Sequence, residues 1–162
     1  MQGTGKKSYI RGDGMIINLV INGEKKKYEI KPDDFLVDVL RGDGYLSVKQ
    51  ACDTGSCGLC TVLIEDKAVL SCSYLAARAD GANIKTIEGL TDEEKKIGEY
   101  LVEEGADQCG YCSSGLILTI IAMTKELENP SDDEIKAYLT GNLCRCTGYG
   151  SQLRAIKKYM EV

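Results

Sequence analysis

Eight cysteines and the complete absence of histidine limit the chemistry available to this 162-residue chain. Without imidazole, the chain lacks the commonest general base, the Ser–His and Cys–His nucleophile pairs, and any zinc site that uses histidine. The first 14 residues contain no apolar segment of a secretory signal, and cysteines in a chain without one favour metal ligation over disulfides. The thiols form two sets of four: Cys52, Cys57, Cys60 and Cys72, then Cys109, Cys112, Cys144 and Cys146.

The first set has the spacing C-x4-C-x2-C…C, which is that of plant-type [2Fe–2S] ferredoxins. Gly55 and Gly58 lie between its cysteines, where positive φ angles let the backbone come close to a ligand. Successive N–H groups in such a loop can point at the anionic sulfurs of a cluster. A zinc ribbon would instead need two C-x2-C pairs about 15–20 residues apart, and the two pairs of this chain are much further apart. The first set therefore predicts a [2Fe–2S] cluster.

The second set combines a C-x2-C pair at Cys109 and Cys112 with a C-x-C pair at Cys144 and Cys146. By spacing alone, a second cluster and a zinc site with four thiolates both remain open. Both pairs lie just before predicted helices, whose unpaired N–H groups favour an anionic cluster, and Arg145 adds a cation between two thiolates. One hypothesis is that Cys144 and Cys146 bind one iron and the C-x2-C pair binds the other.

Charge and hydropathy exclude several classes of partner. The net charge is −5, with lysines scattered among acidic residues, so the chain has neither a basic footprint for nucleic acid nor a polybasic membrane anchor. The longest apolar run, residues 115–123, is shorter than the roughly 20 residues that span a bilayer. We expect a cytoplasmic protein that does not bind nucleic acid and does not span a membrane.

The first half of the chain has the pattern of strands around the first cysteine loop. Asn22-Gly23 is a strong signal for a two-residue hairpin turn. A short helix is predicted where Phe35, Leu36, Val39 and Leu40 recur at helical spacing. Strands are predicted at residues 15–21, 26–30, 61–64, 68–70 and 83–87. A cysteine loop between strands, with the fourth cysteine at the end of a hairpin, suits a β-grasp, ferredoxin-like fold.

The second half has the pattern of helices. Thr91 and Ser131 each stand three residues before a glutamate, which is a capping box. Ser113-Ser114 and Ser151 are the predicted caps of two further helices. The predicted helices cover residues 91–104, 113–127, 131–139 and 151–160, and the second is apolar on most faces, so we expect it at the centre of a bundle. The boundary between the halves is predicted near Glu88-Gly89.

Three motifs together resemble the small iron–sulfur subunit of the molybdenum hydroxylase family. They are CDTGSCGLC at residues 52–60, QCGYCSSG at 108–115 and GNLCRCTGY at 141–149. This family includes xanthine dehydrogenase, aldehyde oxidoreductase, aerobic carbon monoxide dehydrogenase and nicotinate dehydrogenase. The resemblance covers about residues 15–160. One departure is Ser113-Ser114, where relatives usually carry Thr-Pro; we expect serine to cap the helix instead.

The resemblance implies an α+β chain with two [2Fe–2S] domains. Residues 1–14 would be a flexible tail, 15–88 a ferredoxin-like β-grasp domain with the first cluster on the first cysteine set, and 89–162 a four-helix bundle with a second cluster on the second set. Gln108 would hydrogen-bond the pterin of a molybdenum cofactor, and Cys146 would be the ligand nearest to it. The face that contains Gln108, Gly110 and Cys146 would be buried against the subunit that binds this cofactor.

The same resemblance implies a xanthine dehydrogenase-like oxidoreductase complex in which this chain only transfers electrons. A large subunit would bind molybdopterin and a medium subunit would bind FAD, in a heterotrimer or a dimer of heterotrimers. Electrons would pass from molybdopterin through both clusters to FAD or another acceptor, and no residue of this chain would act on substrate. The alternatives are a free-standing ferredoxin, which leaves the second half without a purpose, and a zinc-stabilised interaction module, which fits the first cysteine set poorly.

Overall fold

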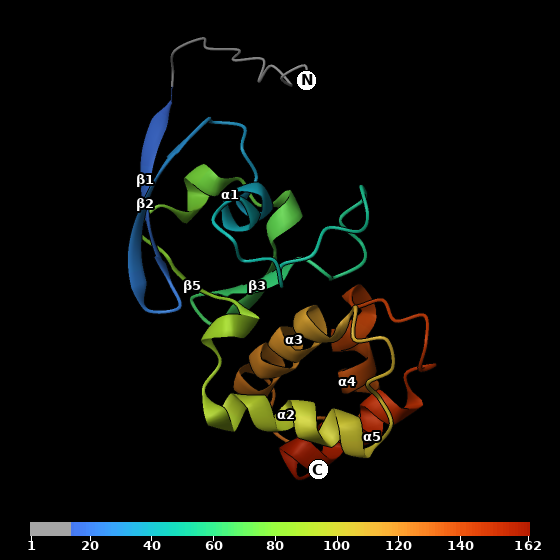
Figure 1. The fold of residues 1–162 in the computed structure, drawn as a ribbon. Helices are drawn as coiled ribbons and strands as arrows, with labels where there is room; N and C mark the ends of the chain where they lie inside the picture. The colour runs from blue at the N-terminus through green and yellow to red at the C-terminus, as the bar shows by residue number, and fades with distance from the viewer. Residues whose placement is uncertain (1–13) are drawn as a thin grey trace, which may run out of the picture.

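The computed structural model describes residues 14–162, in which five β-strands and five α-helices form a mixed α/β structure. The strands and α1 (Leu36–Gly42) form one half of the molecule, and the later helices gather in the other half (Figure 1). This arrangement follows the predicted order of a strand-rich part and then a helix-rich part. Apart from Gly14, the predicted N-terminal tail lies outside the described residues.

One five-stranded sheet is built from two hairpins and a short strand between them. Its strands are β1 (Met15–Ile21), β2 (Glu24–Ile30), β3 (Thr61–Ile64), β4 (Lys67–Leu70) and β5 (Asn83–Lys85). Their order is β2-β1-β5-β3-β4, with β5 parallel to β1 and antiparallel to β3. Asn22 and Gly23 turn the first hairpin with φ angles of 53° and 86°, which confirms the predicted turn.

The core of this half lies between the sheet and α1. Alternation along β1 buries Ile17, Leu19 and Ile21, which belong to the same apolar cluster as Leu36 and Leu40 of α1. Two layers packed around one apolar core are the usual way for a sheet to bury its hydrophobic face. The long segment between α1 and β3, which contains three of the cysteines, leaves this core and extends toward the helical half (Figure 1).

The helical half contains α2 (Asp92–Glu103), α3 (Ser113–Glu126), α4 (Asp132–Tyr138) and α5 (Gly150–Met160). Both predicted capping boxes are present, because Thr91 and Ser131 each exchange hydrogen bonds with the glutamate three residues later. The buried residues of α3 are Gly115, Leu116 and every residue from 118 to 123, so this helix is extensively buried, as its apolar sequence predicted. Among the described residues, no helix is long and apolar enough to cross a membrane.

Two predicted serine caps, at Ser113-Ser114 and at Ser151, are wrong. The N-cap of α3 is Cys112, while the Ser113 hydroxyl donates to Asp107 and the Ser114 hydroxyl donates to the Ser47 carbonyl. The N-cap of α5 is Tyr149, and Ser151 lies inside the helix. Both helix starts therefore depend on the cysteine loops before them and not on a local side-chain cap.

The two halves meet where α3 packs on the sheet. Leu63 of β3 shares an apolar cluster with Leu118, Ile121 and Ala122 of α3. Two ion pairs cross the same boundary: Lys125 Nζ lies 2.6 Å from Asp66 Oδ1, and Lys85 Nζ lies 2.7 Å from Glu94 Oε1. This contact sets the two cysteine loops at adjacent ends of the two halves.

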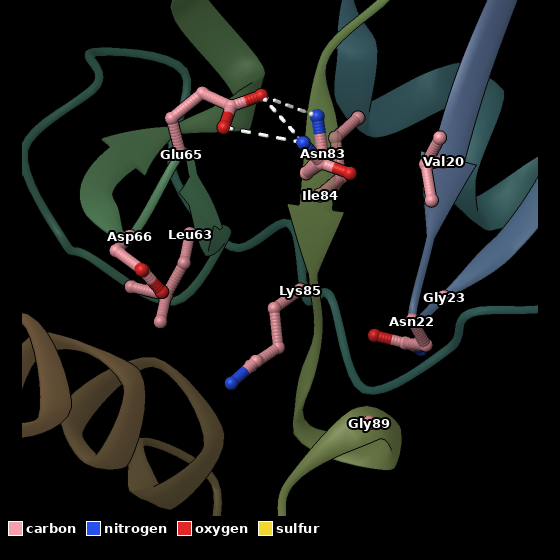
Figure 2. A pocket seen from close by; sticks show the side chains of 10 residues that line it. All are labelled: Val20, Asn22, Gly23, Leu63, Glu65, Asp66, Asn83, Ile84, Lys85 and Gly89. Carbon is pink, nitrogen blue, oxygen red and sulfur yellow. Dashed lines mark hydrogen bonds between the residues drawn. The ribbon is translucent and has the colours of Figure 1, made fainter.

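A hollow of about 270 Å³ opens at this boundary, between β1, the turn after β3, and β5 (Figure 2). On one side, the Glu65 carboxylate accepts hydrogen bonds from the Asn83 backbone N–H at 2.7 Å and from its side-chain amide at 3.0 Å. None of the cysteines lines this hollow. The chemistry suggested by the sequence therefore lies elsewhere.

The buried side chain of Gln152 in α5 provides a test of what stabilises the helical core. Its side chain is 1 % exposed, and neither amide atom has a hydrogen-bond partner among the described residues. Because an unpaired buried polar group is destabilising by about 1–3 kcal/mol, Gln152→Leu should increase the free energy of unfolding by about this amount. Thermal melting would show this as a rise of about 2–4 °C per kcal/mol.

Gln152→Glu is the matched control, because an unpaired buried carboxylate should lower the melting temperature. A lower melting temperature in the Gln152→Leu chain would contradict the prediction and show that the amide is paired in the native protein.

Candidate iron–sulfur sites

The structure brings the first cysteine set together at one end of the sheet half. Cys52, Cys57 and Cys60 lie in the loop before β3, and Cys72 lies in the single helical turn Ser71–Ser73 after β4. Cys57 and Cys60 are buried, whereas Cys52 and Cys72 are partly buried. The thiols interact in two pairs, Cys52 with Cys57 and Cys60 with Cys72. Two thiols for each of two irons is the arrangement that a [2Fe–2S] cluster with four cysteine ligands requires.

The loop backbone favours negative charge at Cys52. The Cys57 thiol, followed by the backbone N–H groups of Ser56, Cys57 and Thr54, lowers the pKa of Cys52 to about 6. Burial instead raises the pKa of Cys57, and burial together with the Cys60 thiol raises the pKa of Cys72 to about 12. Because bound cations deprotonate coordinating thiols, these buried thiols fit a metal-binding role. The N–H groups around Cys52 form the predicted anion-stabilising loop.

Gly58 connects the first cysteine loop to the second. Its φ angle is +74°, and a Cβ placed on it would lie 2.3 Å from the Gly141 carbonyl oxygen. A Cβ on Gly115 of α3 would lie 2.1 Å from the Gly58 carbonyl oxygen. The Leu143 N–H also donates to the Cys57 carbonyl at 2.9 Å. The two cysteine loops thus touch through their backbones, which only glycine permits at this spacing.

The second cysteine set comes together where α3 and α5 begin. Cys109 Sγ lies 3.6 Å from Cys146 Sγ, and the Cys112 thiol interacts with Cys144. Two thiolates on one tetrahedral metal at about 2.3 Å are roughly 3.7 Å apart, so each pair suits one iron. This geometry favours a pairing different from the hypothesis that Cys144 and Cys146 share an iron. Cys144 and Cys146, although only two positions apart in the sequence, therefore contact different partners.

The environments of the second set differ from one cysteine to the next. Burial and the Cys144 thiol raise the pKa of Cys112 to about 11. Burial also acts to raise the pKa of Cys144, but the Thr147 hydroxyl and the N–H groups of Cys146 and Thr147 outweigh it and lower the pKa. Cys109 and Cys146 are exposed, and contact with Cys109 raises the pKa of Cys146. The second set therefore has one sheltered pair and one pair at the surface.

The arrangement of donors fits two-iron clusters better than a single metal ion. Within residues 14–162, no group of three or more Cys, His, Asp or Glu side chains is placed to hold one metal ion. A zinc site with four thiolates would bring all four sulfurs around one point. The sulfurs here are instead associated in pairs, as the two irons of a [2Fe–2S] cluster require.

Gln108 and Gly110 lie at the surface beside the exposed thiol pair. The Gln108 amide donates to the Gly105 carbonyl at 3.0 Å, and Gly110 has a φ angle of +71°. Lys49, which the sequence analysis did not identify, donates to the Gly110 and Tyr111 carbonyls at 3.2 and 2.9 Å. No sequence motif marks Lys49, because it comes from the first cysteine loop and reaches this loop only through the tertiary fold.

Two sets of four thiols, one in the sheet half and one in the helical half, are typical of a two-cluster iron–sulfur electron-transfer protein. Two family models match this chain: "2Fe-2S iron-sulfur cluster binding domain" at residues 19–86 and "[2Fe-2S] binding domain" at residues 86–157. The chain belongs to the family of small [2Fe–2S] subunits of molybdenum hydroxylases, as its motifs predicted.

Two curated relatives illustrate the similarity. The nicotinate dehydrogenase small FeS subunit of Eubacterium barkeri is 44% identical over 148 residues, covering 90% of this chain and 94% of the relative. The xanthine dehydrogenase iron-sulfur-binding subunit of Escherichia coli O157:H7 is 45% identical over 137 residues, covering 82% and 86% of the two chains. Both proteins are named as small or iron–sulfur subunits, which supports an electron-transfer role.

Solved structures agree with this family. Quinoline 2-oxidoreductase from Pseudomonas putida 86 contains a chain with a TM-score of 0.84 and 37% identity, covering 93% of this chain and 96% of that one. The aldehyde oxidoreductase of Desulfovibrio gigas has a TM-score of 0.84 and 32% identity, covering 91% of this chain but only 17% of that one. The same unit thus occurs both as a separate chain and as part of a much longer one.

The backbone contact at Gly58 yields a stability prediction. Gly58→Ala combines a left-handed alanine, which costs about 1–2 kcal/mol, with an overlap that costs about 1–3 kcal/mol. We expect a loss of roughly 3 kcal/mol in the free energy of unfolding and a fall in bound iron. Thermal melting and iron analysis would measure both effects.

Gly81→Ala is the matched control. Its φ angle is +80°, but nothing lies within 4 Å of the added Cβ, so it should lose only the strain of about 1–2 kcal/mol. Equal destabilisation of the two variants would show that contact between the loops does not matter.

Proposed function

We propose that this chain is the electron-transfer subunit of a molybdenum hydroxylase complex, carrying electrons from molybdopterin in a large subunit to FAD in a medium subunit or to another acceptor. The observation that carries this proposal is the gathering of the eight thiols into two sets of four, whose loops touch through Gly58. The proposed ligands of the first cluster are Cys52, Cys57, Cys60 and Cys72, and those of the second are Cys109, Cys112, Cys144 and Cys146. The complex would be a heterotrimer or a dimer of heterotrimers.

The proposed domains follow the segregation of strands and helices. A ferredoxin-like β-grasp domain would cover residues 15–88 and a four-helix bundle residues 89–162, with α2–α5 as its helices. When bound, each [2Fe–2S] cluster supplies one-electron redox chemistry. The cysteines hold each cluster as thiolates, and the buried Leu59 excludes water from the first loop. Backbone N–H groups directed at Cys52 compensate negative charge there.

The contact between the loops supports transfer of electrons within one chain. The Cys57 carbonyl accepts a hydrogen bond from Leu143, whose neighbour in sequence is the proposed ligand Cys144. A single hydrogen bond and a few covalent bonds therefore connect a proposed ligand of the first cluster with one of the second. A free-standing ferredoxin with a single cluster would not need this connection, because it exchanges electrons with its partners through that cluster.

The surface at Cys109 and Cys146 supports docking of the large subunit. Tyr111 is 49% exposed and Leu143 is 52% exposed beside this thiol pair. Exposed aromatic and aliphatic side chains next to functional groups mark protein interfaces. We propose that Gln108 leaves its bond to Gly105 and contacts the pterin, with Gly110 beside it and Cys146 as the nearest ligand.

The number and kind of clusters test the ligand assignment. On the eight-ligand count, the purified chain should contain about four irons and show two [2Fe–2S] electron paramagnetic resonance signals after reduction. Cys146→Ser should alter the second signal and leave the first, while Cys52→Ser should do the reverse. Colourless protein that contains zinc would refute the assignment. A change in the same signal in both variants would show that the ligand partition is wrong.

The docking surface has a separate test. Tyr111→Glu places a charge at the proposed interface, and we expect at least tenfold weaker association with the large subunit, measured by copurification and titration of the subunits. Val102→Glu is the control, because Val102 is 64% exposed on α2 and lies outside the cysteine loops. Unchanged association of the Tyr111→Glu chain, with its iron intact, would place the interface on another face.

A further inference from the structure

Three hydrogen bonds form a closed ring around Cys144. The Thr147 hydroxyl donates to Cys144 Sγ at 3.3 Å, and the Tyr149 N–H donates to the Thr147 hydroxyl oxygen at 3.2 Å. The Cys144 N–H donates to the Tyr149 hydroxyl oxygen at 2.9 Å. Each of the three residues therefore donates once and accepts once. Among the described residues, Thr147 is the one side chain other than cysteine that donates to any of the eight thiols.

Tyr149, which closes this ring, has a strained backbone conformation. Its φ angle is +68°, a left-handed conformation that costs a non-glycine residue about 1–2 kcal/mol. Gly148, with a φ angle of +64°, completes the tight turn before α5. Strain of this kind persists only where surrounding contacts impose it, and it is frequent at functional sites. The turn brings the phenol back over the backbone of Cys144.

The Tyr149 side chain is 39% exposed and lies at the edge of the helical half. Tyr149 lines a largely apolar cavity of about 280 Å³. The cavity is also lined by Ile135 of α4, by Leu139 at the C-terminal end of that helix, and by Leu153 of α5. At its Tyr149 corner, the ring of hydrogen bonds therefore lies at the start of α5, beside α4. Because the Tyr149 N–H occupies the Thr147 oxygen, the hydroxyl proton of Thr147 remains directed at the sulfur.

We propose that Thr147 and Tyr149 are positioning residues that set the reduction potential of the second cluster. This inference rests on the proposed function, in which Cys144 is a ligand. A hydrogen bond to a ligand sulfur compensates the extra negative charge of the reduced form, so it raises the potential. Among the described residues, no side chain other than cysteine donates to the first cysteine set, so this adjustment acts on one cluster and not on the other. A higher potential at the second cluster favours uptake of electrons where they enter the chain.

Redox titration followed by electron paramagnetic resonance tests the proposal on the assembled complex. Thr147→Val keeps the shape of the side chain but removes the donor, so the midpoint potential of the second cluster should fall while that of the first stays unchanged. Thr147→Ser keeps the donor and should restore the wild-type potential. Tyr149→Phe opens the ring but keeps Thr147, and should give a smaller shift in the same direction.

Thr140→Val is the matched control, because its hydroxyl donates to the Ala137 carbonyl and touches no sulfur, so neither potential should move. An unchanged second potential in a fully iron-loaded Thr147→Val chain would overturn the proposal, as would equal shifts in the serine and valine variants. If Thr147→Val loses iron, an unchanged potential in a loaded Tyr149→Phe chain would overturn it. Absence of a second [2Fe–2S] signal in the wild type would instead refute the proposed function.

Discussion

The close backbone contact at Gly58 is the constraint on which the rest of the structure depends. Side chains on Gly58 or Gly115 would overlap the backbone of the opposite loop, so the two halves can meet only where both residues are glycine. The same contact aligns Leu143 with the Cys57 carbonyl. The apolar cluster between β3 and α3 supplies the burial that holds this arrangement, since backbone contacts alone bury little apolar surface.

The two cysteine loops stabilise sulfur charge by different means. The first uses consecutive N–H groups of a glycine-containing loop, and it keeps Cys57 and Cys60 buried. The second adds a side-chain hydroxyl, and the ring of hydrogen bonds that it joins, to the N–H groups of Cys146 and Thr147, and it leaves Cys109 and Cys146 at the surface. Burial and hydrogen bonding are two of the protein's means of adjusting an iron–sulfur centre. This difference between the loops suits two centres with distinct roles. Only the second centre would have ligands at the surface, where an electron donor outside the chain could approach it.

Local signals predicted most of the elements because their causes lie within a few residues. The Asn22-Gly23 turn and the capping box at Thr91 require only neighbouring atoms, and both are present. The cap predicted at Ser113-Ser114 failed because the same hydroxyl can bond to a distant group: Ser114 donates to Ser47, 67 positions away in the sequence. For the second cysteine set, the structure favours pairing Cys146 with Cys109 over the hypothesis that Cys144 and Cys146 share an iron, and the spacing of the cysteines does not reveal this contact.

The sequence by itself determined the chemistry of this protein: two sets of four cysteines without histidine, at spacings that suit iron–sulfur clusters, on a strand-rich and then a helix-rich half. Cysteine spacing carries this information because three ligands of the first set come from one loop. Only the tertiary structure decided which thiols pair, which pair faces the surface, and which distant groups support them. Those features depend on the contact between loops that lie more than 50 residues apart, as Gly58 and Gly115 do, and local physics cannot specify such a contact.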